Sequence, residues 1–220
     1  RTGKLFGFEN YNVVPDIIIL GKGMGGGMPV GAFTASSAHM DLLSDNPKLG
    51  HITTFGGHPV IAAACLATLQ EITETSLIQD TLTKEKLFRT LLVHPLIEEI
   101  RGKGLMLAAM TSSPDITNQI ILKCQDKGLI LFWLLFEGCA IRITPPLTIT
   151  EEEIREGCSI ILDVMNQIQA TNFKDIAIEL WEVKQFENDT IIINPIKKSN
   201  AAESIKPLTQ NKEALKKVTE

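Results

Sequence analysis

Apolar residues along the chain fall into short runs that alternate with longer segments of helical spacing. Residues 16–20 and 32–36 form two such runs, and Pro15-Asp16 and several glycines bound the first. Both runs are predicted to be strands, the first of them buried. The spacing then predicts one helix from near Pro59 to about Glu74 and another over 77–92. This alternation is typical of an α/β protein.

The second half of the chain continues the pattern. Residues 105–109 and 129–132 are predicted strands on either side of a helix near 117–124. Thr150 and Glu153 have the spacing of a capping box, which predicts the start of a final amphipathic helix that ends near Ile168.

Residues after Ile168 give weaker signals. Residues 176–181 fit either a helical turn or a strand, 190–194 fit a short strand, and 197–220 are polar and rich in lysine, so we expect them to be mobile. We therefore expect three parts: the end of a large domain over 1–76, a bridging helix and small domain over 77–168, and an unassigned polar tail over 169–220.

Composition narrows the possible functions. The chain is 44% hydrophobic and 21% charged, with a net charge of -5, which is close to average usage. No basic stripe stands out, so nucleic acid is not an expected partner. No apolar run reaches the length of a membrane helix and no secretory leader is visible, so we expect no membrane association.

Metal-ligand spacing is absent from the histidine and cysteine positions. The four cysteines contain no Cys-x-x-Cys pair, which favours reduced core residues in a cytoplasmic enzyme over a disulfide framework or a metal centre. The positions concerned are His39, His51, His58, His94, Cys65, Cys124, Cys139 and Cys158.

Lys22 is the first candidate for chemistry. The predicted strand leads directly into this lysine and then into a loop rich in glycine, Gly25-Gly26-Gly27-Met28-Pro29-Val30-Gly31. We expect a site rather than bulk water to surround it, because a desolvated amine loses its proton more readily and then attacks carbonyl groups. The alternative is a surface lysine in a flexible loop, but so many glycines suggest a tight local requirement.

Arg142 is a second candidate. It lies between Ile141 and Ile143 in an otherwise apolar predicted strand. An arginine in such a strand either extends to water or meets a buried anion. Its planar fork of donors matches a carboxylate.

Four motifs follow one another in order along residues 1 to about 168. They are Arg1-Thr2-Gly3-Lys4-Leu5-Phe6 followed by the segment Leu20-Gly21-Lys22-Gly23 with its glycine loop, then Thr53-Thr54-Phe55-Gly56-Gly57-His58-Pro59, Arg101-Gly102-Lys103-Gly104-Leu105-Met106 and Ala140-Ile141-Arg142-Ile143-Thr144-Pro145-Pro146-Leu147. Together they resemble the C-terminal portion of class III pyridoxal-phosphate aminotransferases, and most of all the acetylornithine, ornithine and 4-aminobutyrate branch.

The resemblance implies an α/β protein that is part of fold type I, with pyridoxal 5'-phosphate as the cofactor. It implies that Lys22 is the lysine that forms a Schiff base with the cofactor, and that it moves the proton during transfer of an amino group from an amino acid to a 2-oxo acid. Thr54 would bind the cofactor phosphate, in the other subunit of a homodimer, and Arg142 would bind the substrate carboxylate. Read without the resemblance, Thr54 could equally be a turn or cap hydroxyl.

Two other interpretations remain open. In the family, the aspartate that pairs with the pyridine nitrogen lies upstream of the Arg-Thr-Gly motif, so the chain could be a catalytically inactive remnant that acts as an interaction or oligomerisation module. Without the upstream strands, the strand before Lys22 would expose an apolar face.

The third interpretation is a nucleotide-binding module. Gly21-x-Gly23-x-x-Gly26 formally satisfies a dinucleotide fingerprint. However, that fingerprint requires a helix, and Pro29 and Gly31 would interrupt one.

Overall fold

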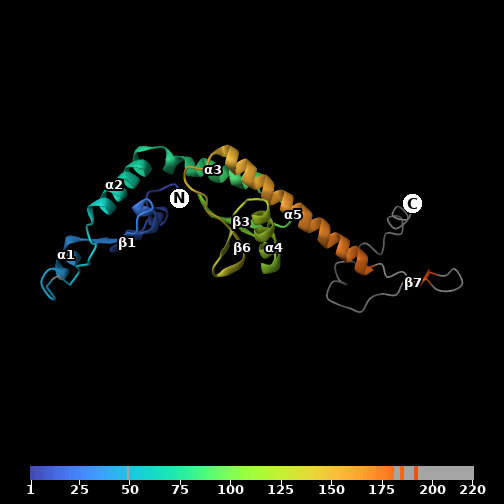
Figure 1. Ribbon diagram of the computed structural model, residues 1–220, viewed down its shortest axis with the longest axis horizontal. Coiled ribbons are helices and arrows are strands. Elements are labelled where there is room, and N and C mark those ends of the chain that lie inside the picture. Colours follow the sequence, from blue (N-terminus) through green and yellow to red (C-terminus); the bar gives the residue numbers. More distant parts are fainter. Residues whose placement is uncertain (49, 181–183, 186–190, 193–220) are drawn as a thin grey trace. The chain divides into compact units, whose positions relative to one another are not determined.

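The computed structural model describes residues 1–48, 50–180, 184–185 and 191–192. Figure 1 shows the helices and strands in sequence colours. The chain divides into two compact units, Arg1–Asn166 and Gln167–Glu220. The first unit carries all of the candidate site residues.

The first strands form an antiparallel hairpin. β1 (Ile17–Gly21) pairs with β2 (Gly31–Ala35), so that Ile19 lies opposite Phe33. Both predicted strands are confirmed to within one residue, but the prediction that the first is buried is wrong, because Ile17 is 53% and Ile19 is 83% exposed. A two-stranded sheet gives each strand a single neighbour, and one apolar face of this hairpin stays open.

Three helices follow the hairpin: α1 (Ser37–Met40), α2 (Pro59–Glu74) and α3 (Leu77–Leu91). The two long ones confirm the predicted helices, and α2 packs on the turn that follows β1. Within 1–48 and 50–76, Gly25 is the one residue that is fully buried. This part of the unit therefore has little core of its own.

A four-stranded antiparallel sheet forms the centre of the unit. Its strands are β3 (Glu99–Lys103), β4 (Met106–Met110), β5 (Phe132–Leu134) and β6 (Glu137–Ile143), in the order β3-β4-β6-β5. The strand predicted at 105–109 is present one residue later. The strand predicted at 129–132 is wrong except at Phe132, where β5 begins. The backbone of residues 129–131 pairs with no described strand, and these residues line a cavity.

Helices α4 (Pro114–Asp126) and α5 (Glu151–Leu180) complete the core around this sheet. α4 packs on β5 and β6, as Figure 1 shows for α4 and β6. The Ser113 side chain accepts a hydrogen bond from the Ile116 amide at the start of α4, so the helix begins earlier than the predicted 117–124. The fully buried apolar side chains include Leu105, Leu107, Ile120, Ile121, Ile141, Ile154, Val164 and Met165.

α5 (Glu151–Leu180) begins at the predicted capping box and is longer than expected. The Thr150 amide and hydroxyl donate to the Glu153 carboxylate at 2.8 and 3.0 Å, and the Glu153 amide donates to the Thr150 hydroxyl at 3.2 Å. The predicted end near Ile168 is wrong. Residues 158–180 contain neither proline nor glycine, so nothing in the sequence stops the helix there.

The second unit contains the residues whose sequence signals were weaker, 176–181, 190–194 and 197–220. Residues 176–180 are helical, and Trp181 lies outside the described residues. β7 (Lys184–Gln185) pairs with β8 (Ile191–Ile192), which confirms the centre of the strand predicted at 190–194. Residues 197–220, which we expected to be mobile, also lie outside the described residues. No helix in the described part of the chain is long and apolar enough to cross a membrane.

Candidate functional site

Lys22 occupies a strained backbone position at the end of β1. It opens the short 3₁₀ turn Lys22–Gly25 with a φ of 51°. This left-handed conformation costs a residue with a side chain about 1–2 kcal/mol, and such strain is common at functional sites. Lys22 is exposed, so the expectation that a site surrounds it is not met within the described residues.

The glycine loop after Lys22 is held against α2. The Gly26 amide donates to the Gly23 carbonyl at 3.2 Å. Gly26 has a φ of 56°, and a Cβ atom there would collide with the Thr68 hydroxyl of α2. This close approach explains one glycine of the loop by packing alone.

Thr54 lies in an exposed turn just before α2. The Gly56 amide donates to the Thr53 carbonyl at 3.3 Å, and the His58 amide donates to the Phe55 carbonyl at 3.2 Å. No side chain caps the N-terminus of α2. Pro59 has no N–H, so the amides of Val60 and Ile61 are the ones that remain available to an anion at the start of this helix.

The turn before α2 and the β hairpin share a cavity. It has a volume of about 630 Å³ and its lining includes Ile19, Phe33, His51 and Thr53. The lining thus includes Thr53, the direct neighbour of Thr54, and residues of β1, the strand that ends just before Lys22. The structure brings these two segments together, but records no direct interaction of either with Arg142 among the described residues.

Arg142 lies in the centre of the four-stranded sheet. Phe132 of β5 and Ala108 of β4 are its cross-strand neighbours. The guanidinium carbon lies 5.1 Å from the centroid of the Phe132 ring. The Nε atom of Arg142 is buried and has no hydrogen-bond partner in the described structure, which is costly for a charged group unless an anion binds there.

A cavity of about 450 Å³ includes Arg142, Phe132, Thr144 and Arg1 in its lining. Arg1 Nη1 donates to the Thr144 carbonyl at 2.6 Å, and the Leu105 amide donates to the Arg1 carbonyl at 2.8 Å. The contact of Phe132 with Arg142 was not predicted, because the register that places these residues opposite each other cannot be read from a single strand.

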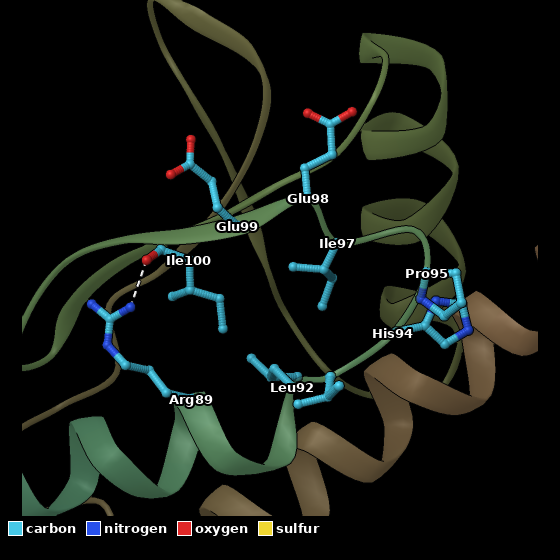
Figure 2. Close-up of a pocket in the computed structure, with 9 residues that line it drawn as sticks. Arg89, Leu92, His94, Pro95, Ile97, Glu98, Glu99 and Ile100 are labelled. Carbon is cyan, nitrogen blue, oxygen red and sulfur yellow. Dashed lines mark hydrogen bonds between the residues drawn. The ribbon is translucent and has the colours of Figure 1, made fainter.

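A third cavity, of about 500 Å³, contains Arg89 in its lining, and this arginine has a structural role that contrasts with the state of Arg142. The cavity lining also includes Leu92, His94 and Ile100. Figure 2 shows Arg89 donating to the Ile100 carbonyl. Arg89 also donates to the Gly102 carbonyl at 2.9 Å and to Glu85 at 2.9 Å. Its guanidinium is thus occupied by the protein itself, whereas Arg142 retains a free donor.

The motif at residues 101–106 has a structural explanation in its two glycines. Gly102 and Gly104 have φ values of 104° and 60°, and a Cβ on Gly104 would collide with the Arg1 carbonyl. The Gly104 amide donates to Glu85 at 2.5 Å. The motif therefore forms a tight turn that holds the start of the chain.

All four cysteines are free thiols. Burial raises the pKa of Cys124 to about 11 and that of Cys158 to about 12. These two thiols are therefore unreactive at neutral pH. Among the residues with a described structure, no group of histidine, cysteine or acidic side chains has the arrangement of a metal site.

Comparison with known families decides the membership of the chain. Residues 1–165 match the family described as "Aminotransferase class-III". The chain belongs to this family. The class III chain is 42% identical over 174 residues to an acetylornithine aminotransferase from Caldanaerobacter subterraneus subsp. tengcongensis, an alignment that covers 77% of this chain and 42% of that protein. It is 36% identical over 191 residues to a putrescine aminotransferase from Pectobacterium atrosepticum, covering 81% of this chain and 41% of that protein.

Solved structures give the same result. An ornithine aminotransferase from Toxoplasma gondii superposes with a TM-score of 0.69 and 29% identity, over 78% of this chain and 41% of that one. The class III chain is thus a mixed α/β protein that forms part of fold type I, as predicted. It spans about two fifths of the length of the curated relatives that it matches.

Pyridoxal phosphate is the cofactor that this family membership indicates. The residues present fit such a group: a strained lysine with an exposed side chain, an uncapped helix N-terminus that follows the Thr54 turn, and an arginine with an unpaired buried donor. The dinucleotide interpretation does not fit. The loop Gly21–Gly26 leads into β2, whereas that fold requires a helix at this point.

Proposed function

We propose that this chain provides the lysine-bearing and carboxylate-binding portion of a pyridoxal-phosphate-dependent aminotransferase. The reaction would transfer an amino group from an amino acid, of the omega-amino or basic type, to a 2-oxo acid. The observation that carries the proposal is the strained Lys22 at the end of β1, within the family's glycine-rich segment. The names of the acetylornithine and ornithine relatives support this class of donor.

Each candidate residue has a separate role in this proposal. When bound, pyridoxal phosphate supplies the electron sink for the reaction. Lys22 Nζ would hold the cofactor covalently, and its amine, once free, would take up the proton of the substrate and give it back during the transfer. Arg142 binds and orients the substrate carboxylate through its free Nε.

Thr54 would bind the phosphate together with the first amides of α2, in the partner subunit of a homodimer. The uncapped start of α2 and the exposed Thr54 turn support this arrangement. The four free thiols, two of them buried, support a cytoplasmic location.

Chemical trapping tests the role of Lys22 directly. The 220-residue chain is mixed with pyridoxal phosphate and reduced with borohydride, and peptide mass spectrometry then locates the modified lysine. We expect modification at Lys22 and its loss in Lys22→Ala. Lys4→Ala, at another exposed lysine in the same part of the chain, should leave it unchanged. Equal labelling of many lysines, with no preference for Lys22, would contradict the proposal.

A turnover assay separates the active enzyme from the inactive remnant. Ornithine, acetylornithine, putrescine and 4-aminobutyrate are each tested with 2-oxoglutarate and the 220-residue chain. Turnover rules out an inactive remnant, whereas specific modification of Lys22 without turnover favours it.

A further inference from the structure

Phe132 and Arg142 face each other across β5 and β6. They are direct cross-strand partners, and such partners project from the same face of a sheet. On its other side Arg142 lies opposite Ala108, whose methyl group leaves space on the β4 side. The large neighbour and the small one together favour one placement of the Arg142 side chain, toward the ring of Phe132.

The contact with Phe132 uses one part of the guanidinium and leaves another free. The guanidinium carbon lies 5.1 Å from the ring centroid, which is within the range of a cation–π interaction. An aromatic ring attracts the cation through its face and offers no strong acceptor to the N–H groups at the edge of the guanidinium. The unpaired, buried Nε of Arg142 agrees with this division.

Arg89 shows the opposite arrangement in the same unit. The carbonyl of Ile100 accepts a hydrogen bond from it (Figure 2), and Glu85 and the Gly102 carbonyl accept two more, so that each nitrogen of its guanidinium already donates within the protein. An acidic side chain beside Arg142 would compete with a substrate in the same way. A ring at this position attracts the arginine without that competition.

We propose that Phe132 is a positioning residue that orients Arg142 for a substrate carboxylate. The inference rests on the proposed role of Arg142 and extends it, because it names the side chain that keeps the arginine ready before the substrate arrives. Preorganisation of this kind lowers the entropy lost on binding. Removal of the ring should therefore weaken carboxylate binding even though Arg142 is still present.

The test measures carboxylate binding to the 220-residue chain. Pyruvate is titrated into labelled protein while the Nε–Hε signals of the arginines are followed by NMR, and pyruvamide serves as the probe without a carboxylate. We expect Phe132→Leu to weaken pyruvate binding roughly two- to fivefold, the size expected for loss of a cation–π contact. Phe132→Tyr keeps the ring and should restore binding to the level of the unaltered chain.

Phe136→Leu is the matched control, because Phe136 is 99% exposed and follows β5 in the same hairpin. It should bind pyruvate as the unaltered chain does. Thermal unfolding checks that each variant folds, and the exposed position of Phe132, at 52%, favours this. A second measurement needs no variant: the ring should shift the Arg142 Hε signal upfield in the unaltered chain.

The outcomes separate the two proposals. The first outcome is that the unaltered chain binds pyruvate, that Arg142→Lys abolishes this binding and that Phe132→Leu leaves it unchanged. In that case the proposed role of Phe132 is wrong, while that of Arg142 stands. An Arg142 Hε signal without a ring shift also overturns the role of Phe132. If the unaltered chain binds pyruvate no better than pyruvamide, the proposed role of Arg142 fails and this inference fails with it.

Discussion

Replacing the same residue type in two strands tests where the core of the first unit lies. Ile141 of β6 is fully buried, whereas Ile19 of β1 is 83% exposed. Ile141→Ala removes three side-chain carbons at a buried position, a transfer cost of about 2.4 kcal/mol at 0.8 kcal/mol for each carbon. Incomplete collapse of the space left behind brings the expected range to about 2–5 kcal/mol.

The change at Ile19 should be much smaller. Most of its surface already contacts water, so Ile19→Ala loses little burial, and the weaker strand preference of alanine costs less than about 1 kcal/mol. Ile141 also lies next to Arg142 in the strand, so its side chain projects from the opposite face. The Ile141 variant should therefore not disturb the Arg142 cavity directly.

Urea unfolding measures both effects. Far-ultraviolet circular dichroism follows the helices, and fluorescence follows the two tryptophans, of which Trp133 pairs with Ile141 across β5 and β6. The slope of the free energy of unfolding against urea concentration should be unchanged, so that the midpoints report stability. Equal losses in the two variants, or a larger loss for Ile19→Ala, would refute the assignment of the core to the four-stranded sheet.

Two further predictions follow from pKa shifts. Cys124 and Cys158, whose pKa values burial raises to about 11 and 12, should react with a thiol reagent at pH 7 far more slowly than the other two cysteines; rapid labelling of all four in the folded chain would contradict this. The hydrogen bonds from Thr150 lower the pKa of Glu153 below its ordinary 4.5, so its contribution to stability is present above that pH and is lost as the pH falls through the lower, folded pKa. Glu153→Gln keeps an acceptor for the capping box and should flatten the acid end of a curve of melting temperature against pH; an unchanged curve would argue against the assignment.

Local patterns in the sequence predicted the elements that depend on local chemistry. The helical spacing of α2 and α3 and the capping box of α5 all appear where the pattern placed them. The end of α5 could not be predicted in the same way. The amphipathic pattern predicted a stop near Ile168, whereas the absence of proline and glycine lets the helix continue to Leu180.

Strands were harder to predict because pairing partners decide them. β3 contains Glu99, Arg101, Gly102 and Lys103, a composition that favours no strand, and it forms because β4 pairs with it along its whole length. The same reasoning applies to the candidate site. The sequence identified Arg142 as a candidate for carboxylate binding. Only the register of β5 against β6 shows that Phe132 lies next to its guanidinium.

The two parts of the proposed site are stabilised in different ways. Arg142 lies between Ile141 and Ile143 of β6, which are both buried, so this chain's own core fixes the backbone of the carboxylate site. Lys22 lies in a left-handed conformation beside a hairpin with an open apolar face, where few buried contacts offset the strain. Burial of that face by further protein would remove Ile19 from water and add buried contacts to the hairpin that leads into Lys22. We therefore expect binding of a carboxylate at Arg142 to depend less on such burial than reaction of the cofactor at Lys22 does.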